Sequence, residues 1–426
     1  MTPLWSPEVE ARIRAGARNL DLQERPDEVI QCTRCVVTNQ RPRIVFDGDG
    51  VCSACLYAER KHSGGKPWEW GIDWGAREVQ LRTLLAQHRK DSGYDVIVPC
   101  SGGKDSAMVA HRLKHDYDMH PLCVLWEPFM YTDVGRRNID AFKHAGFDVV
   151  SMAPNGLIHR KLARLAFEFY GDPFQPFVYG QLAWPMRAAV HFGVPLVMYG
   201  ENGEAEYGGD PAANDMPCWS YREWERVYMK GAGVEKIVSL GIEFGALTHE
   251  EARDLSPFYQ MPSRSELNGT AFDRAEPTEF HWFGYYRPWH PMENFYYACE
   301  HTGFEPNEER SECTYSKFAS IDDKLDGLHF YMAFVKFGIG RCTSDASQQV
   351  RAGDITRDEA LALVERYDGE FPKRHLTECL EYLGMDLNHL QTVIERFRAP
   401  WILRCFPEFS PDGTLEVFGK SPSLSA

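Results

Sequence analysis

The sequence has no excess of positive charge, and this restricts the partners that it can bind. Lysine and arginine number 46 against 62 aspartate and glutamate residues, so the chain of 426 residues has a formal net charge of −16. Nucleic acids and anionic membrane surfaces would meet repulsion at each nonspecific approach. The composition therefore argues against nucleic acid and membranes as partners.

Long hydrophobic runs are missing as well. No apolar stretch reaches the roughly 20 residues that a membrane-spanning helix needs, and Met1–Arg14 carries charges where a signal peptide would be apolar. These absences lead us to expect a cytoplasmic protein. With 43% hydrophobic residues, the chain has enough apolar material for a sizeable core.

The 12 cysteines do not suggest a disulfide scaffold, because such scaffolds belong to much shorter secreted chains. Four of them form two pairs, Cys32-x-x-Cys35 and Cys52-x-x-Cys55. Each pair fits a tight turn that places two thiolates on one ion, and four thiolates complete a tetrahedral Zn²⁺ site. We predict a structural zinc ribbon over residues 31–66. An iron–sulfur cluster and unmetallated thiols are the alternatives.

The region after the cysteine pairs alternates between strand and helix patterns. Buried strands are predicted at residues 94–99, 121–126, 147–153 and 195–199, with helix-length segments between them. Strands separated by helices form parallel sheets with right-handed crossovers. The predicted fold class is therefore a doubly wound α/β sheet, and residues 278–286 can add one more strand.

Composition also predicts where the chain divides. A Trp-, Gly- and Pro-rich connector at residues 63–75 marks one boundary, and helical patterns replace strands after Pro291. The predicted parts are an amino-terminal helical segment (1–30), the zinc ribbon (31–66), the α/β domain (75–286), a mostly helical domain (287–405) and a weakly ordered tail (406–426).

The most informative motif is the Ser-Gly-Gly-Lys-Asp-Ser sequence at residues 101–106, which follows the first predicted strand. Its two glycines let the backbone turn sharply and bring N–H groups against an anion. The helix that follows adds a positive dipole end. Lys104 supplies charge, and Asp105 can hold Mg²⁺ through oxygen. A glycine-rich turn without a ligand is the alternative.

This loop resembles the PP-loop of ATP pyrophosphatases, which grips the pyrophosphate end of ATP and leaves the α-phosphorus open to attack. Several segments together resemble one PP-loop family, the N-acetyl sugar amidotransferases of bacterial surface-glycan pathways. Besides the cysteine pairs and the loop, these segments are 172–181, 198–209, 314–315, 320–324, 327–329, 338–347 and 351–360. The resemblance covers roughly residues 32–372.

The resemblance implies a reaction in which ATP adenylates the oxygen of an acetamido group on a nucleotide-activated sugar. Ammonia then attacks the carbon, AMP leaves, and an acetamidino group remains. The implied cofactors are ATP and Mg²⁺, and the implied partner is a separate glutaminase that supplies ammonia. Met1-Thr2 offers no amino-terminal cysteine, and the sequence has no Gly-x-Cys-x-Gly elbow, so we expect no ammonia production by this chain.

The predicted site residues lie in two loops that follow strands, where open α/β sheets bind ligands. Glu201 can bind Mg²⁺ or orient the incoming amine, and a solvated acidic loop is the alternative. The predicted catalytic residues are Lys104, Asp105, Glu201 and Cys100. The predicted ATP-binding residues are Ser101, Gly102, Gly103, Lys104, Asp105, Ser106 and Gly200.

Two cysteines depart from the expected pattern. Cys100 stands just before the loop, where we expect a small or aliphatic residue. A persulfide on Cys100 would make the protein a sulfur transferase fed by a sulfur-donor protein, whereas a buried strand cysteine is the simpler interpretation. Cys313 occupies a position where the family has glycine. A non-catalytic nucleotide-binding or zinc-scaffold subunit is a third hypothesis, against which the complete loop argues.

Overall fold

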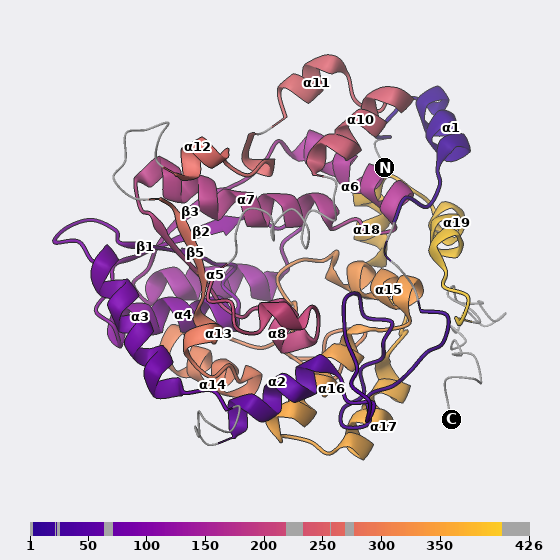
Figure 1. The fold of residues 1–426 in the computed structure, drawn as a ribbon. Coiled ribbons are helices and arrows are strands. Elements are labelled where there is room, and N and C mark those ends of the chain that lie inside the picture. Colours follow the sequence, from indigo (N-terminus) through magenta and orange to yellow (C-terminus); the bar gives the residue numbers. More distant parts are fainter. Residues whose placement is uncertain are drawn as a thin grey trace.

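The structure, a computed structural model, describes residues 3–21, 23, 26–63, 71–218, 233–255, 257–268 and 277–402. In these residues, five strands form one parallel sheet in the order β3-β2-β1-β4-β5 (Figure 1). Their bounds are β1 (Val96–Pro99), β2 (Pro121–Trp126), β3 (Asp148–Met152), β4 (Leu196–Tyr199) and β5 (Glu279–Trp282). The predicted tail and most of the predicted connector lie outside the described residues.

The sheet confirms the predicted doubly wound α/β class. β1 pairs in parallel with β2 on one side and with β4 on the other, so the strand order reverses between β1 and β4. The crevice beyond the carboxyl ends of these strands is the usual ligand site in such sheets. The topology therefore places the residues that follow β1 and β4 at this crevice.

Side chains of the central strands alternate between two cores, one on each face of the sheet. In β1, Val96 and Val98 belong to one core and Ile97 belongs to the other. The first core is covered by α3 (Trp74–His88), α4 (Lys104–His115), α5 (Asp133–His144) and α14 (Pro291–Thr302). The second core is covered by α6 (Gly156–Tyr170), α7 (Gln175–Phe192) and α10 (Val234–Phe244).

The carboxy-terminal region is mostly helical, as predicted. Its helices are α15 (Asp326–Phe337), α16 (Arg341–Ala352), α17 (Arg357–Tyr367), α18 (Leu376–Leu383) and α19 (Leu387–Phe397). Apolar residues of α15, α18 and α19 join the core under α6 and α7, which includes residues from Trp5 to Ile402. This shared core crosses the predicted domain boundary at residue 287.

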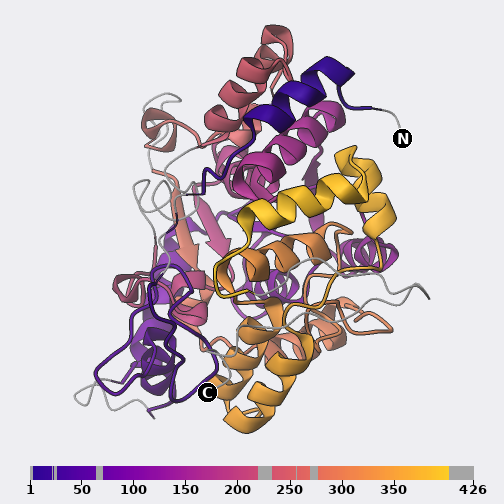
Figure 2. The ribbon, with the colours of Figure 1, turned by 90° about the vertical axis from the view of Figure 1, so that its right-hand side faces the viewer.

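The predicted amino-terminal helix is α1 (Pro7–Gly16). Ser6 caps its amino terminus, because the Ser6 side chain accepts a hydrogen bond from the N–H of Val9. Figure 2 shows α1 lying along α10, near the carboxy-terminal helices. Glu10 Oε1 accepts a hydrogen bond from Arg164 Nη2 at 2.7 Å. In the same buried network, Glu168 Oε1 lies 2.6 Å from His389 Nε2. These charged groups tie α1 to α6 and α19.

Several Gly, Pro and Asn residues in the segment 201–217 predict a loop. The structure instead has the short helix α8 (Gly203–Tyr207) and a 3-10 turn, η2 (Pro211–Ala213), in this segment. The side chain of Asn202 accepts a hydrogen bond from the N–H of Glu204 and so caps α8. The loop prediction was therefore wrong at this point, because Asn and Gly also occur at helix ends. The strand predicted at 278–286 is shorter, because β5 is followed at once by α13 (Phe283–Tyr286).

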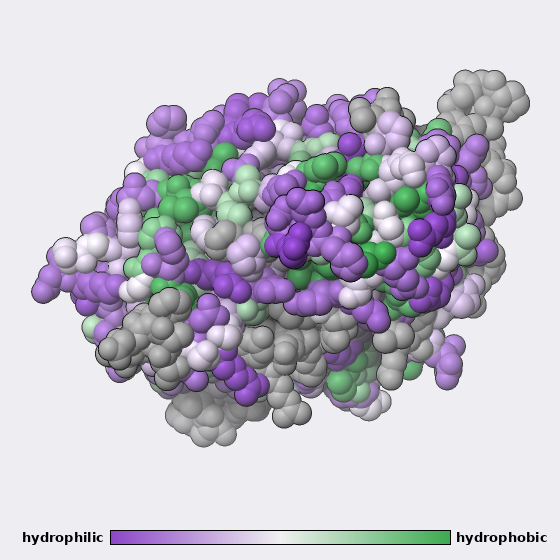
Figure 3. All heavy atoms as spheres, turned by 90° about the horizontal axis from the view of Figure 1, so that it is seen from above, coloured by the Kyte–Doolittle hydropathy of each residue, from purple (hydrophilic) through white to green (hydrophobic). Residues whose placement is uncertain are grey.

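Four further elements lie outside the groups described above. They are α2 (Ser53–His62), α11 (His249–Arg253), η3 (Pro257–Tyr259) and α12 (Arg264–Leu267). The face in Figure 3 carries hydrophobic side chains in separate patches between hydrophilic ones. Within the described part of the chain, no helix has the length and apolar character needed to cross a bilayer.

Candidate active site

A cavity of about 550 Å³ opens beyond the carboxyl ends of the strands. It is lined by residues at the strand ends, by the 101–106 loop, by α7 and by one face of α16. The structure brings the predicted residues together here, because all six loop residues, Cys100, Gly200 and Glu201 line this one cavity. Their chemical roles stay predictions.

Gly102 fixes the shape of the loop. Its backbone has φ +80°, and a Cβ atom there would lie 2.8 Å from the backbone nitrogen of Ile139. A side chain is therefore excluded both by the left-handed conformation and by the close approach of α5. Ser101 Oγ accepts a hydrogen bond from the N–H of Gly103 at 3.3 Å, and Ser106 Oγ donates one to the Gly103 carbonyl at 3.2 Å.

The amino terminus of α4 is the part of the loop that can bind an anion. Its N-cap residue is Gly103, which has no side chain to cap the helix, so the first N–H groups remain for a ligand. Lys104 Nζ lies 2.7 and 2.6 Å from the two carboxylate oxygens of Asp105. Asp105 Oδ1 also accepts a hydrogen bond from Asn294 at 3.1 Å. This donor set fits a phosphate chain on the loop and Mg²⁺ on Asp105.

Glu201 has the electrostatics of a proton-transfer group. Burial raises its pKa to about 7; the nearby charge of Asp105 adds to the shift and Lys104 opposes it. Tyr207 Oη donates a hydrogen bond to Glu201 Oε1 at 3.3 Å. Burial raises the pKa of Tyr207 well above its usual value, so Tyr207 remains a donor. A carboxyl group that titrates near neutrality can accept and return a proton during catalysis.

The sequence analysis missed four residues that line the cavity from the carboxy-terminal region: Asp322, Arg341, Asp345 and Gln348. Burial raises the pKa of Asp322, and a hydrogen bond from Ser101 opposes the shift. Arg341 Nε lies 2.9 Å from Asp345 Oδ1, one helical turn away. The sequence feature that could have indicated them is the spacing of Arg341, Asp345 and Gln348, which places these three residues on one face of a helix.

Cys100 lines the cavity but is 8% exposed. Its N–H continues the sheet by donating to the Val124 carbonyl at 2.9 Å. Its side chain belongs to the core on the α4 side, which also contains Cys123. This position agrees with both interpretations of Cys100, a core residue and a thiol beside the bound phosphates.

Cys313 is a buried core residue. Its backbone has φ +64°, in the left-handed region that favours glycine, which explains why glycine suits this position. The side chain is 1% exposed, and its Sγ lies 3.2 Å from the Glu370 carbonyl oxygen. Burial raises the pKa of Cys313 well above its usual value. These features argue against a reactive thiolate at Cys313.

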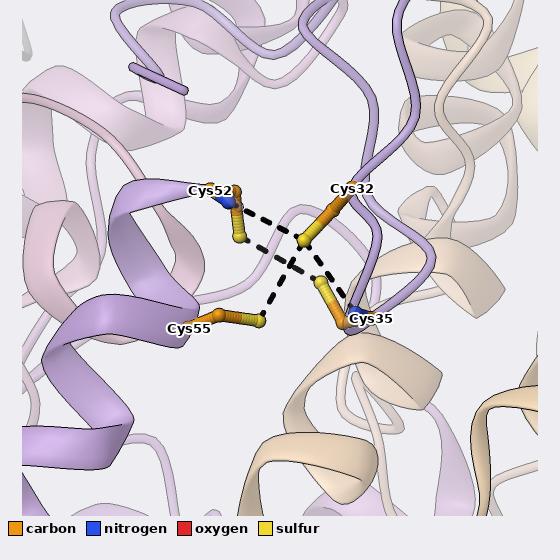
Figure 4. A group of neighbouring side chains, drawn as sticks. All are labelled: Cys32, Cys35, Cys52 and Cys55. Carbon is orange, nitrogen blue, oxygen red and sulfur yellow. Dashed lines mark hydrogen bonds between the residues drawn. The ribbon is translucent and has the colours of Figure 1, made fainter. Parts of the chain in front are cut away.

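The four predicted metal ligands point toward one another (Figure 4). The Sγ atoms of Cys32 and Cys55 lie 3.8 Å apart and those of Cys35 and Cys52 lie 3.7 Å apart, and all four fall within 4.8 Å of one another. A tetrahedron with Zn–S bonds of about 2.3 Å has edges of about 3.8 Å. The geometry therefore fits a single tetrahedral ion. A cubane cluster places a separate iron under each thiolate, which would spread the sulfurs farther apart.

The cysteine module packs against the wall of the cavity. α2, which begins just after Cys52, contacts α8 and α16 (Figure 1). Arg43 donates two hydrogen bonds to Glu204, at 2.9 and 2.6 Å. Lys61 Nζ lies 2.8 and 3.0 Å from the carboxylate oxygens of Glu206. Because α8 also carries Tyr207, the module supports a residue that contacts Glu201.

The chain is an α/β protein with a parallel sheet and a glycine loop at its strand-order reversal, the place where sheets of this class commonly bind phosphorylated ligands. Residues 312–404 match a family model described as LPS biosynthesis protein WbpG-like, C-terminal domain. This match includes α16, so one wall of the cavity is similar to a domain of LPS biosynthesis proteins.

Two further proteins show weaker similarity. An uncharacterized protein of Methanocaldococcus jannaschii is 24% identical over 124 residues, and the match spans 28% of this chain and 42% of that relative. The U34-tRNA thiolase NcsA from Methanococcus maripaludis, solved with its 4Fe-4S cluster, is 13% identical. That structural match covers 83% of this chain and 95% of the thiolase, with a TM-score of 0.26. A likeness this weak carries no argument about function.

Proposed function

We propose that the protein is an ATP-dependent, AMP-forming amidotransferase that acts on an acetamido group of a nucleotide-activated sugar. The observation that carries this proposal is one cavity with two different walls. The complete 101–106 loop forms one wall, and a helix from the segment similar to LPS biosynthesis proteins forms another. Adenylating enzymes need such a site, because ATP and the acceptor must meet at the α-phosphorus.

In the first step, the amide oxygen of the acceptor attacks the α-phosphorus, and the bond to pyrophosphate breaks. Lys104 and the N–H groups of the loop neutralise the charge that develops on the departing pyrophosphate. Asp105 would hold Mg²⁺, which would withdraw charge from the phosphates. The contacts of Lys104 with Asp105, at 2.7 and 2.6 Å, support this proposal because they hold both groups at the loop.

In the second step, ammonia attacks the activated carbon, the bond to the adenylate oxygen breaks, and AMP leaves. The attacking nitrogen carries an extra proton, which Glu201 accepts. Its pKa of about 7 matches this role, because the group is substantially ionised at neutral pH and still basic enough to take a proton. A separate glutaminase supplies the ammonia under this proposal.

The decisive experiment incubates the protein with MgATP and UDP-N-acetylglucosamine, with ammonium in one reaction and sulfide in another. Mass spectrometry then follows AMP and the acceptor. We expect AMP and replacement of the acetamido oxygen by NH with ammonium, and no product with glutamine alone. Lys104→Met should abolish AMP formation, whereas Lys236→Met, on the exposed surface of α10, should not. No AMP from any acetamido sugar nucleotide would contradict the proposal.

A PP-loop sulfur transferase is the second candidate, and the position of Cys100 beside the loop favours it. A persulfide on Cys100 would attack the activated carbon and deliver sulfur after its S–S bond is cleaved by a thiol reductant. This function predicts sulfur in the product and loss of turnover in Cys100→Ser. Full amidotransferase activity in Cys100→Ser would remove Cys100 from the mechanism.

We further propose that Cys32, Cys35, Cys52 and Cys55 hold one structural Zn²⁺. The sulfur–sulfur distances and the complete burial of the four ligands support this proposal. Metal analysis should find about one zinc per chain and no acid-labile sulfide. Substitution with Co²⁺ should give the absorption of a tetrahedral thiolate site, whereas a cluster would give iron and sulfide in equal amounts.

A further inference from the structure

One face of α16 is polar and lines the cavity. Arg341, Asp345, Gln348 and Gln349 all line it, at spacings of one and two helical turns. Helix α16 passes close to α8, which carries Tyr207. The α16 face, as we call these four residues, therefore stands where it can contact whatever is bound beside the loop.

Another side of the cavity has a different character. It is formed by apolar and aromatic residues of α7 and the strand ends: Trp126, Phe177, Leu182, Tyr199 and Trp282. Aromatic and aliphatic walls suit the flat, apolar surface of an adenine base. The 101–106 loop lies in the same cavity as both sides. With pyrophosphate on the loop and adenine on the apolar side, the α16 face remains for the acceptor.

The chemistry of the α16 face suits a ligand rich in hydroxyl groups. Arg341 and Asp345 form an ion pair, and Asp345 also accepts a hydrogen bond from Thr314 at 2.7 Å, so neither charge stands alone. Gln348 makes no side-chain hydrogen bond to any residue that the structure describes. Its amide can donate and accept at once, and so can each hydroxyl of a sugar.

A phosphate chain suits this face less well, because it would meet the carboxylate of Asp345. Gln349 is partly engaged, since its Nε2 lies 3.4 Å from the Met292 sulfur. Gln348 is therefore the residue on this face that is most available to a ligand. Gln348 is half-buried, so its side chain lies partly within the cavity lining.

We propose that the α16 face binds the sugar ring of the acceptor, with Gln348 as a specificity-determining contact to ring hydroxyls. This inference rests on the proposed function, because it assumes that an acetamido sugar is the acceptor. It adds to that function the surface that distinguishes one sugar from another.

The test compares Gln348→Ala with Gln391→Ala, a matched change on the exposed side of α19. AMP formation is measured against the concentration of UDP-N-acetylglucosamine and, separately, of ATP. We expect Gln348→Ala to raise KM for the sugar nucleotide by about tenfold, with KM for ATP unchanged. Gln391→Ala should leave both constants unchanged. Equal melting temperatures of the three proteins exclude a folding defect.

Calorimetry separates this inference from the proposed function. UDP-N-acetylglucosamine is titrated into protein saturated with a non-hydrolysable ATP analogue. Weaker sugar binding by Gln348→Ala than by the wild type supports the assignment of sugar binding to the α16 face, even if the wild type forms no AMP. Absence of AMP would contradict only the proposed amidotransferase reaction. An unchanged sugar affinity, or a rise in KM for ATP instead, overturns the inference. Absence of sugar binding by the wild type also overturns it.

Discussion

Arg351 donates a hydrogen bond from Nη1 to the sulfur of Cys35 across 3.6 Å. Its Nη2 donates at the same time to the backbone carbonyl of Glu206 in α8, at 2.8 Å. Burial disfavours the charged guanidinium, but the charges of the cysteine thiolates outweigh this and raise the pKa of Arg351. One side chain of α16 thus connects the cysteine module with the helix beside Glu201.

We expect Arg351→Met to weaken metal binding by about 10- to 100-fold, because groups that hydrogen-bond to metal ligands contribute to affinity on this scale. The rate of metal release to a chromogenic chelator measures this effect directly. Arg351→Lys should bind the metal more tightly than Arg351→Met but less tightly than the wild type. The control Arg366→Met, on the exposed side of α17, should bind the metal as tightly as the wild type. A wild-type rate of metal release in Arg351→Met would show that Arg351 does not contribute to metal affinity.

Gly102→Ala should abolish ATP binding, because the new Cβ would meet backbone atoms of α5 that cannot move aside. The control is Gly93→Ala. Gly93 also has positive φ, +78°, but a Cβ there would lie in open space. Gly93→Ala should therefore lose only about 1–2 kcal/mol of unfolding free energy, the cost of the left-handed conformation, and keep its activity. Chemical denaturation and KM for ATP distinguish the two effects.

Glu201 predicts a specific dependence of stability on pH. Its pKa is about 7 in the folded protein, above its ordinary value of 4.5. Between these values the folded state binds more protons than the unfolded state, so stability falls as pH rises from about 4.5 to 7. Glu201→Gln should therefore melt higher than the wild type at pH 8 and equally at pH 4. A Glu250→Gln control on α11 should show no such difference.

The same variant tests the catalytic role of Glu201. The rate of the wild-type reaction should rise with pH as Glu201 loses its proton near pH 7. Glu201→Gln should lower kcat by about 10²- to 10⁴-fold and remove this rise. A variant that keeps the wild-type pH profile would show that another group accepts the proton.

The buried network beneath α1 predicts sensitivity to acid. Burial opposes ionisation of Glu168, but hydrogen bonds and charges from His389 and Arg164 lower its pKa to about 2. The stabilisation is fully present above pH 4.5 and is lost as pH falls toward 2. Glu168→Gln should cost about 3–5 kcal/mol at pH 7, because Arg164 loses its buried partner. Urea unfolding measures this loss of unfolding free energy, and the exposed control Glu365→Gln should show none.

The strands were predictable from the sequence because each is a short apolar run between turns. β2, at Pro121–Trp126, has the predicted bounds, and β1, β3 and β4 are shorter than predicted by one or two residues at one or both ends. β5 ends four residues before the predicted end, because α13 follows it. The sequence pattern predicts a helix over residues 181–192, but α7 begins six residues earlier, at Gln175. Its Pro176 stands in the first turn, where proline is tolerated. Its Pro185 lies inside the helix, where local propensity alone predicts a break.

The site was predictable only where its signal is local. The 101–106 loop and the cysteine pairs are compact motifs whose residues act together because they are close in sequence. Arg341, Asp345 and Gln348 reach the cavity only through the packing of α16, and no local pattern connects them with the loop. Glu201 was identified from its place after β4, but its raised pKa depends on burial that the sequence does not reveal.

The core that includes residues from Trp5 to Ile402 has a consequence for synthesis of the chain. The 101–106 loop and the sheet leave the ribosome well before α16, so the nascent chain can form the loop while another part of the cavity lining is still being translated. Under the proposed function, adenylation would wait for α16, which completes the lining, and for α18 and α19, which complete the core. The order of the chain would then delay ATP consumption until the acceptor site is complete.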